Sequence, residues 1–347
     1  MASQPTFDPN GVGVKGSFFG LPYDTEQARI VVIPMPWDVT VSYGAGAAEG
    51  AKAIWEASPQ IDYAQWDMEA AWKLPLAMAE IPEVWHAKGQ ALRKHAAQYI
   101  GWLEEGSPEP ESTRMQAILN EVNAQCAQLM TYVEQECAYW HGEGKQTILL
   151  GGDHSTPLGH MKTLAAKHEA FGILQIDAHA DLRAAYEGFE FSHASIMYNA
   201  LKLPEVTQLV QVGIRDFCEE EKSLIEASKG RISTYYDAAL KEGQYQGVTW
   251  ASQCERIISE LPQKVYVSFD IDGLDPKLCP HTGTPVPGGF ELDEVMYLVK
   301  QVVASGRQII GADLCEVAPG PDEWDGNVGA RALYRMALLM AQSQGLA

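Results

Sequence analysis

Three short segments of the chain concentrate side chains that bind hard divalent cations. They are GGDHS at 151–155, DAHAD at 177–181 and SFDIDG at 268–273. Carboxylates with a minority of imidazoles suit manganese and related divalent ions better than the thiolate-rich chemistry of structural zinc. Two such ions can generate hydroxide at neutral pH and clamp a substrate, so the pattern predicts a hydrolase. The candidate ligands are His154, Asp177, His179, Asp181, Asp270 and Asp272.

Each of these segments comes directly after or within an apolar run that has the composition of a strand. The runs are TILLG (147–151), GILQID (172–177) and VYVSFDID (265–272). In open α/β sheets, ligands bind beyond the carboxyl ends of the strands. Buried carboxylates there are costly unless they are paired or bound to metal. GGDHS alone could be a capped turn and DAHAD alone a solvated loop, but the three segments together indicate a cation site.

Two further histidines are candidates for the same site. His193 follows the loop AAYEGFEF (184–191), which begins next to DAHAD, so it could reach back over the site. An imidazole is suited to moving protons near neutral pH. His281 in PHTGTP is a candidate for the wall of the site, whereas the remaining histidines lie in helical or loop patterns typical of ordinary surface or core positions.

The elements that must position these residues alternate between strands and helices. Short β-branched runs predict buried parallel strands, and amphipathic stretches predict the helices between them. This alternation implies a doubly wound, mostly parallel α/β sheet. The expected strands are 30–33, 147–151, 172–177, 209–214, 265–272 and 308–314, and the expected helices are 113–139, 157–168, 216–227, 292–305 and 326–344.

The chain has no clear linker between domains. Residues 1–28 are punctuated by glycine and proline and are expected to form an N-terminal arm, with residues 29–347 forming the catalytic domain. The polar segment 104–113 is expected to be a surface loop inside a helical region. Residues 66–112 give the weakest pattern, and they are consistent with an insertion that supports the rim of the site or an oligomer contact.

Composition narrows the possible partners. Lys plus Arg number 25 and Asp plus Glu 46, so the formal net charge is −21. Such an acidic chain argues against nucleic-acid binding and is compatible with a small cationic substrate, although solubility alone would also explain it. Six scattered cysteines form no CxxC pair. Without an apolar signal region or a run of about 18–20 apolar residues, no membrane contact and a cytoplasmic location are expected.

At these motifs the chain resembles the arginase–agmatinase family of ureohydrolases. The resemblance extends from PMPWDVTVSYGAG (34–46) to ADLCEVAPGPD (312–322). It implies a single α/β/α three-layer domain, two Mn²⁺ ions, hydrolysis of a guanidino compound to urea and an amine, and assembly into trimers or hexamers. By the same resemblance, His154 with Asp181 and His179 with Asp272 bind one ion each, while Asp177 and Asp270 bridge.

The resemblance also implies roles for two residues outside the ligand set. Glu316 in DLCEVAP matches the acid that grips the guanidinium, which suits a bidentate carboxylate. His193 in FSHAS matches the proton shuttle, working with Asp181. A planar, resonance-stabilised guanidinium is a poor electrophile, so it needs a strong nucleophile and a proton for the leaving nitrogen.

The substrate is left open by the motifs. DLRAAYEG (181–188) and TGTPVPGG (282–289) are similar to agmatinases, whereas arginases have DxN where Leu182 and Arg183 stand here. The agmatinase segment SYRPG reads SYGAG, with Gly44 in place of arginine. In this change, and in the length of the 66–112 region, the chain resembles guanidine hydrolases, some of which use Ni²⁺. Guanidinobutyrase, formimidoylglutamase, for which Arg183 could bind an acidic substrate, and a non-catalytic subunit are further alternatives.

Overall fold

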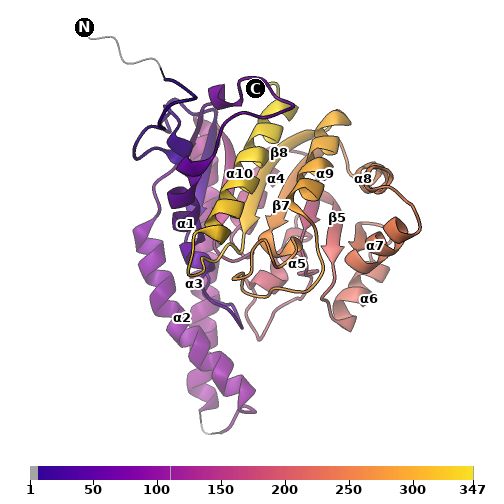
Figure 1. The fold of residues 1–347 in the computed structure, drawn as a ribbon. Coiled ribbons are helices and arrows are strands. Elements are labelled where there is room, and N and C mark those ends of the chain that lie inside the picture. Colours follow the sequence, from indigo (N-terminus) through magenta and orange to yellow (C-terminus); the bar gives the residue numbers. More distant parts are fainter. Residues whose placement is uncertain (1–6, 110, 347) are drawn as a thin grey trace.

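Eight parallel strands form one sheet at the centre of the molecule (Figure 1). The computed structural model describes residues 7–109 and 111–346. The strand order is β2-β1-β3-β8-β7-β4-β5-β6, and each neighbouring pair is parallel. The strands are β1 (Ile30–Met35), β2 (Leu76–Met78), β3 (Gln146–Gly151), β4 (Phe171–Ile176), β5 (Val206–Ile214), β6 (Ile232–Tyr236), β7 (Lys264–Asp270) and β8 (Gln308–Cys315).

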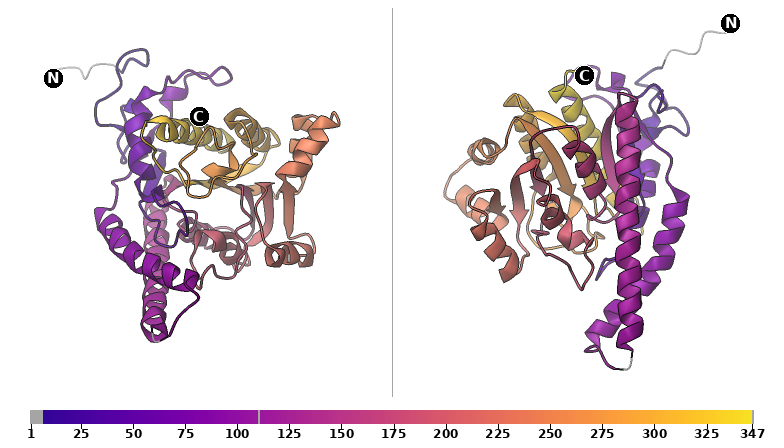
Figure 2. Two further views of the ribbon diagram at one scale, coloured as in Figure 1. Left: turned by 60° about the horizontal axis from the view of Figure 1, so that its bottom comes forward. Right: turned by 180° about the vertical axis from the view of Figure 1, so that it is seen from behind.

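Helices cover both faces of the sheet, which gives the predicted three-layer α/β/α fold (Figure 2). The helices are α1 (Gly50–Ala57), α2 (Glu83–Glu104), α3 (Ser112–Gly142), α4 (Leu158–Ala165), α5 (Ile196–Ala200), α6 (Glu219–Ala227), α7 (Asp237–Tyr245), α8 (Trp250–Ser259), α9 (Leu292–Ala304) and α10 (Trp324–Ser343). One core lies between the sheet and α1 with α7–α10, and the second lies between the sheet and α2–α6. Successive strand residues alternate between the two cores, as Ile30 and Val31 do.

The six strands expected from the sequence are all present, and the two that the sequence analysis missed are the edge strands. Edge strand β2 has only three residues, and edge strand β6 (ISTYY) is mostly only partly buried. β2 is too short for its apolar residues to mark it as a strand, and β6 is not a continuous apolar run. The five expected helices correspond to α3, α4, α6, α9 and α10, whereas α1, α2, α5, α7 and α8 were not predicted.

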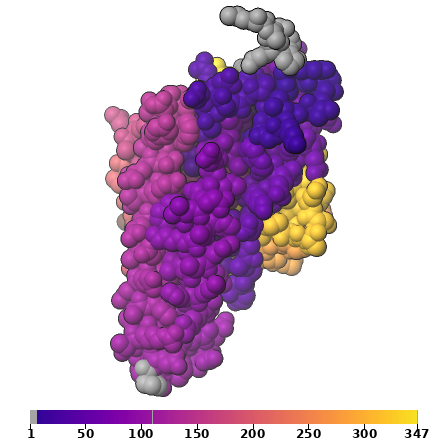
Figure 3. Space-filling model, turned by 90° about the vertical axis from the view of Figure 1, so that its left-hand side faces the viewer, coloured from indigo at the N-terminus to yellow at the C-terminus, as the bar shows by residue number. Residues whose placement is uncertain are grey.

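The region from 66 to 112 contains one long helix, α2, which pairs with α3. Figure 3 shows the two helices side by side along one edge of the molecule, and their connected ends extend beyond the carboxyl edge of the sheet (Figures 1 and 2). Helix α3 buries Ile118, Val122, Cys126 and Met130, which form the predicted apolar face. The segment between α2 and α3 is a loop, as predicted, although residue 110 lies outside the described residues.

The first described residues pack onto the body of the fold. Phe18, Phe19 and Leu21 are buried in the core beside α1 and α10, and the Tyr63 hydroxyl donates to the Phe19 carbonyl at 2.8 Å. Residues 1–6 of the predicted arm lie outside the described residues. Within the part of the chain that the structure describes, no helix combines the length and apolar character needed to cross a membrane.

Candidate metal centre and active site

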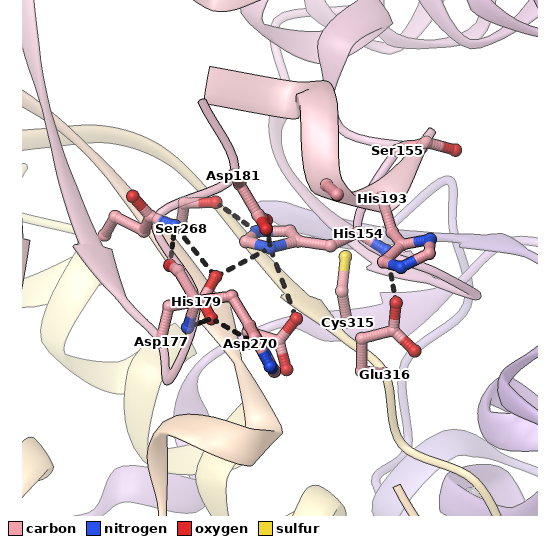
Figure 4. Close-up of polar contacts among 12 residues, drawn as sticks. His154, Ser155, Asp177, His179, Asp181, His193, Ser268, Asp270, Cys315 and Glu316 are labelled. Carbon is pink, nitrogen blue, oxygen red and sulfur yellow. Dashed lines mark hydrogen bonds and ion pairs between the residues drawn. The ribbon is translucent and has the colours of Figure 1, made fainter. Parts of the chain in front are cut away.

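The four central strands deliver the candidate site residues to one edge of the sheet. These strands, β3, β8, β7 and β4, are neighbours in the sheet. His154 comes shortly after β3, Glu316 directly follows β8, Asp270 ends β7, and Asp177 directly follows β4. Because parallel strands end at the same edge, side chains from distant parts of the sequence meet there (Figure 4). The structure therefore brings together all six predicted ligands.

A first group of ligand atoms surrounds the His154 imidazole. Its Nδ1 lies 3.0 Å from Asp177 Oδ2, 3.0 Å from Asp181 Oδ2 and 3.2 Å from Asp270 Oδ2. His154 is 1% exposed, and the three acids are 0–4% exposed. One ligand atom each from His154, Asp177 and Asp270 lies within 4.8 Å of the others, so these three could hold one ion.

A second group forms around His179. Its Nδ1 lies 2.9 Å from Asp272 Oδ2 and 3.6 Å from Asp177 Oδ1. Asp177, His179 and Asp272 also satisfy the 4.8 Å condition, so they could hold a second ion. Asp177 belongs to both groups, which agrees with its predicted bridging position. The bridging position of Asp270, which belongs to the first group alone, stays a prediction.

The charges of the cluster are poorly balanced without a cation. Burial and the neighbouring carboxylates of Asp272 and Asp177 raise the pKa of Asp270 well above its ordinary range. Burial, reinforced by Asp177, raises the pKa of Asp181 to about 7. Burial alone would lower the pKa of His154, but the surrounding carboxylates raise it well above its ordinary value. Divalent cations would relieve this repulsion between acids, so the residues fit a metal pair.

The orientation of His154 is set by two residues that the sequence analysis did not identify. The Ser268 hydroxyl donates to Asp313 Oδ2 at 2.9 Å, so its oxygen is free to accept from His154 Nε2, also at 2.9 Å. The proton therefore belongs on Nε2, and Nδ1 is left free to face the carboxylates. This arrangement is typical of metal-binding histidines, whose second nitrogen is held by an acceptor.

A second supporting contact comes from strand β4. Gln175 Nε2 donates to Asp177 Oδ2 at 2.8 Å, and Gln175 Oε1 accepts from Gln211 Nε2 on β5 at 2.7 Å. Gln175 and Ser268 each stand two residues before a ligand, so they share its face of the strand. A polar residue inside an otherwise apolar run, two positions before an acid, is the sequence signal that could have identified both.

The DAHAD segment ends in a turn and is not extended throughout. Asp181 has a φ of 55°, in the left-handed region that non-glycine residues rarely adopt. This turn brings the Asp181 carboxylate back to His154, while His179 points to Asp272. The three side chains therefore do not simply line one side of a strand. Such backbone strain costs roughly 1–3 kcal/mol and is concentrated at functional sites.

Glu316 lies on the other side of His154, also with a left-handed φ of 62°. Its Oε1 accepts from the His154 backbone amide at 2.9 Å, and the residue is 5% exposed. Burial and the nearby Asp153 raise the pKa of the Glu316 carboxyl well above its ordinary value. Among the described residues, no lysine or arginine forms an ion pair with Glu316. A cationic ligand would supply the missing partner.

A small cavity of about 100 Å³ opens next to the ligands. Two of the proposed ligands, His179 and Asp181, line this cavity. The other lining residues include Tyr43, Arg183, Tyr186, His193, Phe217 and Thr284. The structure thus places His193 at the cavity, as the sequence predicted. Burial and the nearby His179 and His154 lower the pKa of His193 to about 3. A neutral imidazole at this position can accept a proton.

The structure also gives a physical reason for Gly44. Its amide donates to the Gly283 carbonyl at 3.3 Å, and a Cβ on Gly44 would lie 2.9 Å from that oxygen. The backbone contact between the 44 and 283 loops therefore leaves no room for a side chain at position 44. His281, by contrast, pairs with the buried Asp325 of α10 at 2.8 Å and is not among the side chains that line the cavity.

Comparisons with known proteins agree with this geometry. The sequence model of the arginase family matches residues 28–340. The N(1)-aminopropylagmatine ureohydrolase of Thermus thermophilus is 32% identical over 299 residues, which cover 85% of this chain and 84% of that protein. The agmatinase of Cronobacter sakazakii is 28% identical over 300 residues, which cover 82% and 91% of the two chains.

Solved structures match the fold over nearly the whole chain. The proclavaminate amidino hydrolase from Streptomyces clavuligerus aligns with a TM-score of 0.71 at 22% identity. The alignment covers 94% of this chain and 97% of that one. At this identity the match establishes a shared fold and nothing finer.

Proposed function

Because the chain belongs to the arginase family, we propose that it is a metal-dependent ureohydrolase that cleaves a C–N bond of a small guanidino compound and releases urea. Among the relatives, the names agmatinase and N(1)-aminopropylagmatine ureohydrolase support an agmatine-like substrate, with a guanidino group on an aliphatic chain. Atoms and charge balance as alkylguanidinium plus water giving urea plus the protonated amine.

One observation supports this proposal most strongly. Two groups of possible metal ligands share Asp177, and a buried carboxylate without a basic partner, Glu316, lies directly behind His154. The first feature provides for two cations side by side, and the second provides for a cationic substrate next to them. A carboxylate can bind a planar guanidinium through two parallel hydrogen bonds. No other part of the described chain combines these two features.

We assign the ligand roles as predicted from the sequence. His154 and Asp181 would hold one ion, His179 and Asp272 the other, with Asp177 and Asp270 between them. When bound, such a pair of ions supplies a nucleophilic water at neutral pH and electrostatic stabilisation of the developing charge. The carboxylate-rich ligand set supports Mn²⁺, with Ni²⁺ as the alternative metal.

The protein's own residues would bind the substrate and move the proton. Glu316 holds the guanidinium, which orients its carbon toward the ligand cluster. Asp181 accepts a proton from the attacking water, and His193 passes a proton to the nitrogen of the departing amine. Both residues face the same cavity, which supports their acting in sequence.

A substrate panel tests the proposal. Urea release is measured from agmatine, arginine, 4-guanidinobutyrate and guanidine, after loading with Mn²⁺ or Ni²⁺, and metal content is measured on the same samples. We expect two ions per chain and, among the four compounds, the fastest turnover with agmatine. Preference for guanidine would replace the agmatinase assignment, and an absence of urea from all four would contradict the hydrolase.

Three further properties are proposed on lesser support. Residues 29–347 would form the catalytic domain, with 1–28 as its arm. The six cysteines are unpaired thiols, which supports a reducing, cytoplasmic location. A homo-oligomer, a trimer or hexamer, is proposed from the family resemblance alone. Light scattering would measure the assembly.

A further inference from the structure

The loop that leads to His193 has two faces with different partners. We call residues 182–192 the wall loop. On its inner face, the Arg183 guanidinium lies 4.8 Å from the centre of the Tyr186 ring, and that ring lies 6.0 Å from the His193 ring. All three side chains line the cavity. The position of the wall loop therefore determines the position of His193.

The tip of the wall loop is a tight turn. Tyr186 and Phe189 exchange both backbone hydrogen bonds, at 3.1 and 2.8 Å. Between them, Glu187 and Gly188 have φ angles of 53° and 84°, which is the conformation of a two-residue hairpin turn. The loop thus projects as a narrow hairpin, with the cavity on one side and the pair of helices α2 and α3 on the other.

The outer face of this turn is held by α2 and α3. Phe189 is fully buried, with its ring 5.4 Å from that of Tyr99 on α2. Asn123 on α3 forms hydrogen bonds with the backbone of the two residues on either side of Phe189. Its Nδ2 donates to the Gly188 carbonyl at 3.0 Å, and its Oδ1 accepts from the Glu190 amide at 2.9 Å. A single side chain therefore satisfies the backbone on both sides of the buried ring.

The same stretch of backbone is also attached from the inside. Asn199 on α5 donates to the Glu190 carbonyl at 2.8 Å and to the Ser195 carbonyl at 3.0 Å. Asn199 thus ties the wall loop to the turn that carries His193. Glu190 is held by Asn123 through its amide and by Asn199 through its carbonyl. These contacts form a continuous chain from α3 to His193.

We propose that Asn123 is a positioning residue, which holds the wall loop against α3 and thereby keeps His193 at the cavity. The proposal rests on the proposed function, since it acts through the proton transfer assigned to His193. It also gives the α2–α3 pair a role, because these helices provide the fixed surface against which the loop packs. Both hydrogen bonds lie near solvent, so their removal should loosen the loop without unfolding the domain.

The contact itself is tested by hydrogen exchange, which does not depend on activity. The Glu190 amide should exchange roughly tenfold faster in Asn123→Ala than in the wild type, because it loses its acceptor. Asn123→Asp keeps an oxygen for that amide and should stay close to the wild type. Asn120→Ala is the matched control, since Asn120 is exposed on the same helix and its side-chain Oδ1 accepts only from Gln116 Nε2. Unchanged exchange in Asn123→Ala would overturn the proposal.

The route through His193 is tested by a double-mutant cycle. Asn123→Ala should lower kcat by about five- to tenfold in the wild type, with metal content unchanged. In the His193→Ala background the same substitution should change kcat by less than about twofold, because the group it positions is gone. Equal losses in both backgrounds would show a merely structural role and overturn the proposal. An inactive wild type would instead mark failure of the proposed function, and the exchange result would still stand.

Discussion

Two regions meet at the cavity, and they are held in place by different forces. The six proposed ligand side chains form an inner cluster, which stands within a few residues of the ends of three central strands, β3, β7 and β4. The wall loop lies opposite this cluster. Helices α2 and α3 hold it through the buried ring of Phe189 and two hydrogen bonds near solvent. The inner cluster therefore shares the stability of the whole sheet, whereas the wall depends on local contacts.

This difference suits the two regions to different roles, metal binding in the inner cluster and proton transfer at the wall loop. Residues that directly follow central strands have their backbone positions fixed by the sheet, which suits ligands that would hold ions at fixed separations. A loop on a helical support is free to change between relatives without disturbing those ligands. Substitutions in the inner cluster should therefore change metal content, and substitutions in the wall should change turnover alone. Four predictions test this division.

The largest effect is expected for Asp177→Asn. Asp177 belongs to both ligand groups and is fully buried, so the loss of its charge weakens both sites at once. We expect fewer than two ions per chain and a loss of activity of about 10⁴-fold or more. Elemental analysis and urea release measure the two outcomes. Full metal content in this variant would show that Asp177 is not shared.

His193→Ala tests the wall directly. Removal of a positioned proton donor or acceptor should lower kcat by roughly 10²–10⁴-fold. Metal content should stay at the wild-type value, since His193 is not in either ligand group. The comparison with Asp177→Asn is then clear: both variants are slow, but only one loses metal. Turnover at the wild-type rate would show that the wall takes no part in proton transfer.

Glu316→Gln separates substrate binding from metal binding at the same edge of the sheet. The substitution keeps an oxygen to accept from the His154 amide but removes the charge that would pair with a guanidinium. A lost charge in a buried pair should cost about 3 kcal/mol or more in kcat/KM, or about 100-fold. Metal content should not change. Loss of metal would place Glu316 with the inner cluster instead.

Ser268→Ala should give the smallest effect, because it removes a residue that orients the proposed ligand His154 and leaves the ligand itself in place. The hydroxyl that accepts from His154 Nε2 is lost, and the imidazole is free to rotate or change tautomer. Loss of such a contact lowers metal affinity by about 10–100-fold. Titration of the metal-free protein with Mn²⁺ measures the change, with exposed Ser252→Ala of α8 as the control. Equal affinity in both variants would contradict this role for Ser268.

The elements predicted correctly were those whose burial leaves a repeated pattern in the sequence. Strands such as GILQID are covered on both faces and read as apolar runs, and α3 shows its buried stripe at four-residue spacing. The edge strand β2 was missed because it has only three residues, and β6 because four of its five residues are only partly buried. Helix α2 was missed because its buried face is marked by few large apolar residues: two of its five buried positions are Gly89 and Ala96.

From the sequence alone we identified the family and predicted the types of the ligands and their place at strand ends. Those features depend on local composition: acids and imidazoles must follow buried strands if they are to meet in a sheet of parallel strands. Only the tertiary structure decided which strands are neighbours, how Asp181 turns back to His154, and that Ser268, Asp313 and Asn123 support the site. These are contacts between segments far apart in the chain, and their geometry comes from packing, which no local pattern in the sequence records.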